Sequence, residues 1–196
     1  IFVAVGGTNN GGFIYSSSDG ISWDNRTTGN TYNFGVIYGN GNFVTAPYGT
    51  DNITRSSTDG ISWSVKATLS SRNLWDINYG NGMFVITGEN GKIFTSTNLT
   101  TWTQRTSNVT VLIGSVTYGN NQFVTVGQQG TILTSENGIT WTSRTSGTTN
   151  ILMAVTYGND LFIAGGSDVI LKSSDGITWT ALTPVNSLGI YHLTSK

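Results

Sequence analysis

The sequence predicts an all-β fold made of five copies of one four-stranded unit, and three observations lead to this expectation. Five tryptophans, five phenylalanines and four Tyr-Gly-Asn triplets recur along the chain at spacings of 38 to 41 residues. Apolar and β-branched runs alternate with Gly, Asn, Asp and Ser turns, which is typical of short strands. Thr, Ser, Asn and Gly make up 98 of the 196 residues, so too few helix-forming residues remain for amphipathic helices.

The fourth unit illustrates the expected order of strands. A first strand ends at Tyr118, and the Gly-Asn turn after it can supply the positive φ of a tight hairpin. A second strand is expected at residues 123–126, and a Gly-containing turn leads into a third strand at residues 131–134. The segment from Ser135 to Trp141 then turns the chain into a fourth strand that ends near Arg144.

Repetition of a four-stranded unit of about 40 residues is typical of a β-propeller, in which each unit forms one blade of a ring. We therefore expect one domain, residues 1–196, with five blades of four antiparallel strands. Residues 188–192 match the first-strand pattern, with His192 in place of the repeat tyrosine, whereas the chain begins at a second strand. The C-terminal strand is therefore expected to join the N-terminal blade and close the ring without a free edge. The expected blades are residues 188–196 with 1–28, then 32–68, 73–106, 111–145 and 151–183.

A short motif, Ser-x-Asp-Gly-x-Thr-Trp, recurs at the turn before each fourth strand. Its Asp or Asn can accept hydrogen bonds from the amides of the turn, and its Trp covers the hairpin. The motif resembles the Asp-box, or BNR, repeat of sialidases and Ycf48-type photosystem II assembly factors, although one residue is missing between the Asp and the Trp. The Tyr-Gly-Asn-Gly-x-Phe-Val pattern is similar to repeats of bacterial secreted and phage-associated proteins. The expected structural residues are Asp19, Trp23, Asp59, Trp63, Asn98, Trp102, Asn137, Trp141, Asp175 and Trp179.

Charge and composition exclude several classes of function. Nine basic and ten acidic residues leave a net charge of −1, which gives no attraction to nucleic acid or to an anionic membrane. No apolar run approaches the length of a membrane span, so no membrane insertion is expected. The lack of cysteine and the single His192 argue against zinc, and one carboxylate per turn is too few for calcium. We expect no cofactor and no metal.

An enzyme is not expected, although the resemblance to sialidases raises the question. The resemblance would imply three clustered arginines, a tyrosine nucleophile assisted by a glutamate, and an acid/base carboxyl group. Here Arg26, Arg105 and Arg144 each follow a repeat Trp by three residues and therefore belong to outer strands. Glu89 and Glu136 fall in loops at opposite ends of the expected propeller. No catalytic residue is therefore assigned.

The best candidates for ligand binding are residues that break the repeat on one rim of the propeller. That rim carries the loops between blades and those between the second and third strands, and the loop at residues 46–52 is unlike its counterparts. An aromatic face beside amide, carboxylate and guanidinium groups is the chemistry of sugar recognition. Filling of a wider gap between two blades is the alternative reading of the aromatic residues. The candidate ligand-binding residues are Tyr32, Tyr48, Asp51, Arg72, Asn73 and Trp75.

These features predict a non-catalytic, lectin-like module that binds a glycan through the rim. The alternative is a protein-interaction or structural scaffold that docks a partner protein, as an assembly factor or a virion component would. A sialidase-like glycosidase is the third hypothesis. Low charge with abundant Thr, Ser and Asn suits an extracellular, cell-surface or virion-associated protein. The identity of the ligand and the oligomeric state stay open at this point.

Overall fold

The computed structural model describes residues 1–8, 11–27, 32–49, 52–71, 73–182 and 189–194. These residues form five antiparallel sheets, of which the first has three strands and the others have four. The first two sheets comprise β1 (Phe2–Thr8), β2 (Gly11–Ser17) and β3 (Asp24–Asn25), then β4 (Tyr32–Gly39), β5 (Asn42–Tyr48), β6 (Ile53–Ser57) and β7 (Ser64–Thr68).

The remaining three sheets follow in chain order. They comprise β8 (Leu74–Gly80), β9 (Met83–Gly88), β10 (Ile93–Ser96) and β11 (Thr103–Arg105), then β12 (Ile113–Gly119), β13 (Gln122–Gly127), β14 (Ile132–Ser135) and β15 (Thr142–Arg144), and finally β16 (Leu152–Gly158), β17 (Leu161–Gly166), β18 (Ile170–Ser173) and β19 (Thr180–Ala181). Two 3-10 turns, η1 (Glu89–Gly91) and η2 (Gln128–Gly130), follow β9 and β13. Among the described residues the structure has no helix with the length and apolarity that a membrane crossing requires.

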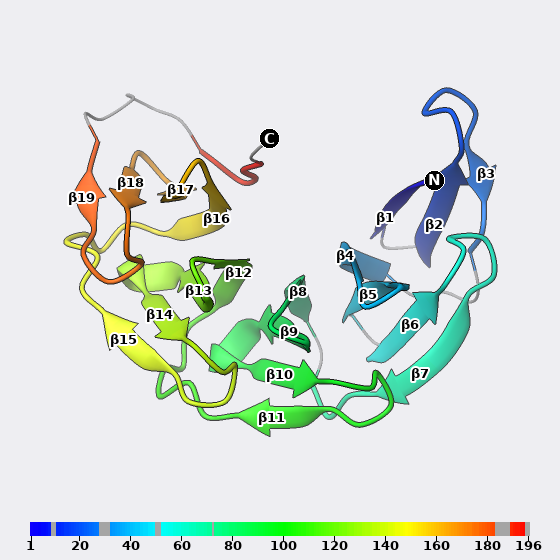
Figure 1. The fold of residues 1–196 in the computed structure, drawn as a ribbon, viewed down its shortest axis with the longest axis horizontal. Coiled ribbons are helices and arrows are strands. Elements are labelled where there is room, and N and C mark those ends of the chain that lie inside the picture. Colours follow the sequence, from blue (N-terminus) through cyan, green and yellow to red (C-terminus); the bar gives the residue numbers. More distant parts are fainter. Residues whose placement is uncertain (9–10, 28–31, 50–51, 72, 183–188, 195–196) are drawn as a thin grey trace.

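The sheets lie next to one another in an arc (Figure 1). The first strand of each four-stranded sheet faces the centre, and the last strand lies at the outside. The inner strands contact each other in turn, so that β8 lies between β4 and β12, and β12 lies between β8 and β16. The expected all-β architecture of five antiparallel sheets is therefore confirmed.

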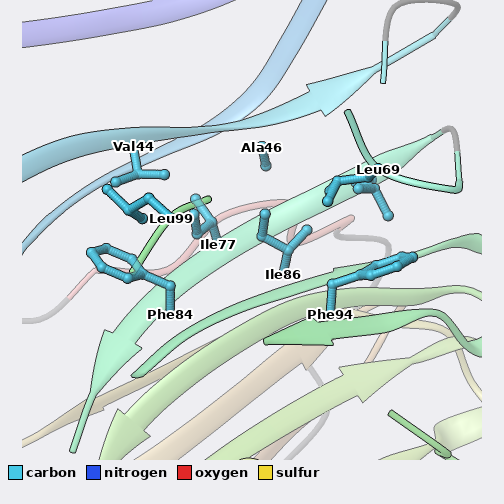
Figure 2. Packing of buried hydrophobic residues seen from close by; sticks show 9 residues of the cluster. Val44, Ala46, Leu69, Ile77, Phe84, Ile86, Phe94 and Leu99 are labelled. Atoms are coloured by element: carbon cyan, nitrogen blue, oxygen red, sulfur yellow. The ribbon is translucent and has the colours of Figure 1, made fainter. Parts of the chain in front are cut away.

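The hydrophobic core is divided into separate layers between neighbouring sheets. Figure 2 shows the layer between the second and third sheets, where Val44 and Ala46 of β5 face Ile77, Phe84 and other residues of the third sheet. Similar layers lie between the third and fourth sheets and between the fourth and fifth. The third and fourth sheets are therefore stabilised mainly by their two neighbours, as in other repeat proteins.

A glycine and a tyrosine make the closest contact between successive inner strands. In each case the repeat tyrosine of one sheet lies against a glycine at the end of the preceding inner strand, where an added Cβ would overlap the ring. Each Tyr-Gly pair of the repeat therefore contacts two neighbouring sheets. Its tyrosine packs on the glycine of the preceding sheet, and its glycine contacts the tyrosine of the following sheet. The contacts are Tyr79 on Gly39, Tyr118 on Gly80 and Tyr157 on Gly119.

The recurring Ser-x-Asp turns have one hydrogen-bond pattern. In the second sheet, Oδ1 of Asp59 accepts bonds from the amides of Ile61 and Ser62, both at 2.8 Å, and the Trp63 indole N–H donates to the carbonyl of Gly60 at 3.2 Å. These amides, with the Ser57 hydroxyl, hold the pKa of Asp59 at about 2. The equivalent acceptors are Asp19, Asn98, Asn137 and Asp175.

The expected closure of the ring is not confirmed by the described residues. Within the described residues the first sheet has the order β1-β2-β3, so β1 keeps one free edge. Residues 189–194 instead lie beside the fifth sheet, where Gly189 bridges Ser167 and the Ile190 amide donates to the carbonyl of Gly166 at 3.1 Å. These residues do not pair with β1 because the arc is open between its first and fifth sheets. β1 lies on the opposite side of that opening from the fifth sheet (Figure 1). Residues 183–188 and 195–196 of the predicted closing segment lie outside the described residues.

Candidate functional site

Four aromatic side chains gather where the second and third sheets meet. Tyr32 and Phe34 lie on β4, Tyr48 ends β5, and Trp75 lies near the start of β8. Phe34 stacks on Trp75 with ring centroids 4.6 Å apart and meets Tyr48 edge-on at 4.7 Å. Tyr32 stacks on the other side of the group, 5.5 Å from Phe34. We call these four residues the aromatic cluster.

The register of the strands explains why the cluster forms at this place. Tyr32 and Tyr48 are direct partners in the pairing of β4 with β5, so their side chains lie on one face. Phe34 and Trp75 each precede a repeat tyrosine by four residues and occupy the same level of adjacent inner strands. At that level the next inner strands carry Gly114 and Met153. Two large rings therefore meet only between the second and third sheets.

Two cavities adjoin the aromatic cluster. The rim cavity, about 570 Å³, is lined by Trp75, Glu89, Leu112, Gln128, Met153 and Tyr191 among others. The central cavity, about 580 Å³, lies between the inner strands and is lined by Phe34, Trp75, Asp76, Met153 and residues 191–194. Trp75, Met153 and Tyr191 line both cavities. The cluster thus lies where the rim cavity meets the centre of the arc.

Polar groups border the rim cavity beside the rings. The side-chain amide of Asn73 donates to Glu89 at 2.8 Å, and the Glu89 amide donates to the carbonyl of Asn73 at 3.1 Å. These two bonds fix the position of the Glu89 carboxylate. Burial raises the pKa of the Tyr48 hydroxyl, and the nearby negative charge of Glu89 adds to this effect. The Trp75 indole N–H is buried without a hydrogen-bond partner within the described part of the chain.

Asp76 connects two inner strands and is not a free acid at the centre of the arc. Its Oδ2 accepts hydrogen bonds from the Ser115 hydroxyl and the Val116 amide, both at 2.9 Å, and its Oδ1 accepts one from the Ile77 amide at 2.8 Å. Burial raises the pKa of Asp76, while these three donors act in the opposite direction. The free edge of β12 is thereby satisfied by the side chain of β8, which is a structural role.

The structure brings together three of the six residues proposed from the sequence. Tyr32, Tyr48 and Trp75 belong to the aromatic cluster, and Asn73 borders it through Glu89. Asp51 and Arg72 lie outside the described residues.

Sequence reasoning missed Phe34 and the contribution of Glu89 to this site. Phe34 is 41% exposed and presents the most accessible ring of the cluster. Its signal was its place four residues before a repeat tyrosine, which it shares with Trp75. Glu89 carries the same kind of signal, since it directly follows β9 where the neutral Gln128 follows β13.

The three arginines that follow a repeat Trp are engaged in hydrogen bonds within their own sheets. The Arg105 and Arg144 guanidinium groups donate through Nε to threonine hydroxyls of the adjacent strand, at 2.8 and 2.9 Å, and Arg26 bonds Ser16 in the same way at 3.1 Å. These arginines therefore brace outer strands. No group of three or more His, Cys, Asp or Glu residues lies close enough to hold a metal ion within this part of the chain.

A further cavity, about 690 Å³, lies at the outer side of the fourth sheet and is a feature of the repeat. Gly130 approaches Ser146 and Thr148 there, and Gly91 makes the same approach to Ser107 and Val109 in the third sheet. Because this geometry recurs from sheet to sheet, it does not single out a binding site.

Comparison with solved structures identifies the type of fold. No protein-family model and no curated protein sequence matches the chain. Solved structures do match: a structure of YCF48 bound to D1 peptide has a TM-score of 0.66 and 17% identity, and covers 94% of this chain and 68% of that one. The nidogen/laminin complex gives a TM-score of 0.68 and 14% identity, with coverage of 92% and 75%. The WD40 β-propeller domain of Doa1 gives 0.70 and 12%, with coverage of 93% and 63%.

These likenesses establish a propeller-type repeat fold. The identities are too low to carry function from any of the three proteins to this chain. The chain spans about two thirds to three quarters of the structures that it matches. The kinship with the Asp-box repeat rests on the residues of the turns and stays a prediction.

Proposed function

We propose that this protein is a non-catalytic binding module whose ligand site is the rim cavity together with the aromatic cluster. The observation that carries the proposal is the exposed ring of Phe34, which lines the central cavity and stacks on Trp75, whose side chain also lines the rim cavity of about 570 Å³. That volume falls within the range of about 300–1,000 Å³ that is typical of small-molecule sites. No sheet other than the second and third combines these features in the described residues.

A carbohydrate is the ligand that this chemistry favours. Aromatic rings cover the apolar C–H face of a pyranose, and planar polar groups bond its hydroxyls. Phe34 offers the ring, and the Glu89 carboxylate offers acceptors. The hydrogen bond from Asn73 holds Glu89 in place before a ligand arrives, which lowers the entropic cost of binding.

A glycan array on the purified chain, followed by calorimetry on any glycan that binds, tests this proposal. Phe34→Ala removes an exposed ring and is expected to weaken binding by about tenfold or more, since burial of such a ring is worth about 1.5–3 kcal/mol. Tyr38→Ala is the matched control, because Tyr38 is also an exposed aromatic of β4 but lies at its other end. The proposal is wrong if no glycan binds or if both variants lose binding equally.

A peptide segment of a partner protein is the second candidate ligand. The observation that favours it is the row of inner strands around the central cavity, because free strand edges can pair with an extended chain. Two of the similar structures are complexes, of YCF48 with a D1 peptide and of nidogen with laminin, which is in keeping with this candidate. A peptide library screened with the same two variants separates it from the glycan hypothesis.

The absence of catalysis is tested on the same material. Hydrolysis of a fluorogenic sialoside and of neutral glycosides is expected to stay at the background rate. Turnover that disappears in Glu89→Gln would contradict the non-catalytic proposal and favour a glycosidase.

A further inference from the structure

Exposed apolar side chains occur at both ends of the arc, as they also do in the second sheet at Phe34, Tyr38, Ile61 and Val65. At the first sheet, Ile1, Phe2, Ile21 and Trp23 are exposed, and at the fifth sheet Leu161, Ile177 and Leu182 are exposed. Elsewhere in the described chain most large apolar side chains are packed between sheets. A patch of this kind at the end of a repeat array marks a surface that another element covers.

The interfaces inside the arc show what such a covering element looks like. The Ser-x-Asp turn of each later sheet packs on the start of the second strand of the sheet before it. Gly60 approaches Ile1 and Val3 in this way, and Gly138 approaches Met83. In the fifth sheet, the carbonyl of Asp175 accepts a hydrogen bond from the Gln122 side chain at 2.6 Å. The same contact is thus made repeatedly within one chain.

At the first sheet, the Ser-x-Asp turn makes no such contact with another sheet in the described residues. Its Ser-x-Asp turn, residues 17–23, has no preceding sheet to pack on, and Gly20 approaches only Phe2 of its own sheet. Ile21 is 84% exposed, whereas the equivalent Ile139 is 46% exposed. Trp23 is 42% exposed, whereas the equivalent Trp141 is 5% exposed.

At the fifth sheet, the start of the second strand is not covered by a Ser-x-Asp turn in the described residues. Leu161 is exposed, although Gln122 at the equivalent position of the fourth sheet is buried. Ile163 is half-buried, although its counterparts Val85 and Val124 are completely buried against the next sheet. The surface that would receive a following Ser-x-Asp turn is therefore present and uncovered.

The strands at the two ends of the arc also complement each other. β1 has a free edge, and Gly189 and Ile190 lie beside the fifth sheet, where they contact Ser167 and Gly166. In the second sheet Tyr38 pairs with Phe43 and Val36 with Thr45. The same register would place His192 opposite Phe2 and Ile190 opposite Ala4. The two ends of the arc are thus the two halves of one sheet-to-sheet interface.

We propose that these ends bind each other between two copies of the chain. Residues 189–192 of one copy pair with β1 of the next copy, and the Ser-x-Asp turn at residues 17–23 of that copy covers Leu161 of the first. The contact continues the interface that already joins the sheets within the chain. A second copy is the occupant because the first and fifth sheets of one chain lie on opposite sides of the opening of the arc (Figure 1). Such a head-to-tail contact uses two different surfaces and can add further copies.

Blocking each end separately tests the head-to-tail contact. Light scattering after size-exclusion chromatography is expected to show a mass that increases with concentration for the unmodified chain. Ile21→Asp at the first sheet and Leu161→Asp at the fifth sheet should each give monomers alone. An equal mixture of the two should give a species of two chains, since one free end of each kind remains. Ile139→Asp is the matched control and should assemble like the unmodified chain.

Cysteine pairing tests the register, and the chain contains no cysteine of its own. Chains with Ala4→Cys mixed with chains carrying Ile190→Cys are expected to form a disulfide-linked dimer under mild oxidation. Chains with Ile139→Cys, mixed in the same way with Ile190→Cys, should form at least tenfold less.

The opposite results overturn the proposal. A chain that is monomeric at every concentration, or blocked variants that stay monomeric when mixed, would show that copies do not join in this way. An Ala4→Cys/Ile190→Cys double variant that forms its disulfide within one chain would assign the contact to ring closure instead. Neither result depends on the proposed ligand, so the assembly and the binding function can fail separately.

Discussion

The contact between Gly80 and Tyr118 offers the sharpest test of how the sheets are held together. Gly80 ends β8, and a Cβ added there would overlap the Cγ of Tyr118. Because Cγ lies close to the backbone, it can move away only if the strand that carries Tyr118 also shifts. Gly80→Ala therefore has to displace the ring or separate β8 from β12. Overpacking of this kind costs about 1–3 kcal/mol, and loss of ring burial adds to it.

We expect Gly80→Ala to lower the free energy of unfolding by about 2–3 kcal/mol. For a chain of this size, each kcal/mol lowers Tm by about 2–4 °C, so a decrease of about 4–12 °C is expected. Circular dichroism during heating measures Tm, and urea unfolding checks the free energy independently. The slope of the unfolding free energy against urea concentration should be the same for Gly80→Ala and for the control variant Gly114→Ala, if their unfolded states are alike.

Gly114→Ala is the control because it changes the same residue type in the next inner strand. A Cβ there would meet Met153 atoms at 3.6 Å, which is ordinary contact. Since the backbone of Gly114 also does not need a positive φ, this variant should change stability by less than about 1 kcal/mol. Equal Tm values for the two variants would refute the idea that the tyrosine-on-glycine contact joins the sheets.

Two further outcomes follow from the hydrogen bonds of the fold. Asp76→Ala leaves the Val116 and Ile77 amides without their acceptor, so urea unfolding should show a loss of about 2–4 kcal/mol, and an unchanged midpoint would contradict the linking role. The pKa values of Asp59 and Asp175, about 2, lie below the ordinary value of 3.8, so the unfolded state binds more protons between these limits. Stability should therefore fall as pH decreases from about 4 to 2, and an Asp59→Asn/Asp175→Asn variant should show a smaller decrease.

The local architecture could be predicted from the sequence because each signal lies within a few residues. The period of the tryptophans and phenylalanines located the five sheets, and the Ser-x-Asp pattern located the turns before the outer strands. The hydrogen bonds of Asp59 arise from its own turn and need no distant partner. Such features are set by neighbouring residues, so a single sequence reveals them.

The candidate site could be predicted only in part. Tyr32, Tyr48 and Trp75 come together because the ends of β4, β5 and β8 that lie next to this rim are adjacent, which follows from the repeat alone. Phe34 was missed because it lies within the repeated first-strand pattern and does not break it, whereas its ring is partly exposed beside the central cavity. The bond between Asn73 and Glu89 joins loops 16 residues apart, and no local pattern indicates it.

Closure of the ring could not be predicted from the sequence. The curvature of a repeat array is the sum of small rotations at every interface, and no single residue determines it. The first-strand pattern at the C-terminus indicates what residues 189–192 can pair with, but it contains no information on how far β1 lies from them.

The hydrogen bonds across the inner strands also limit how the units can be rearranged. The Val155 amide donates to the Ser115 hydroxyl, and that hydroxyl donates to Asp76, so three successive sheets share one polar chain. Gly35 and Ala154, at the same level of other inner strands, have no side-chain polar group. Exchanging the third and fifth units in the gene would therefore leave a carboxylate facing the wrong neighbour. The five units look alike in sequence, yet their order is part of the information that the fold requires.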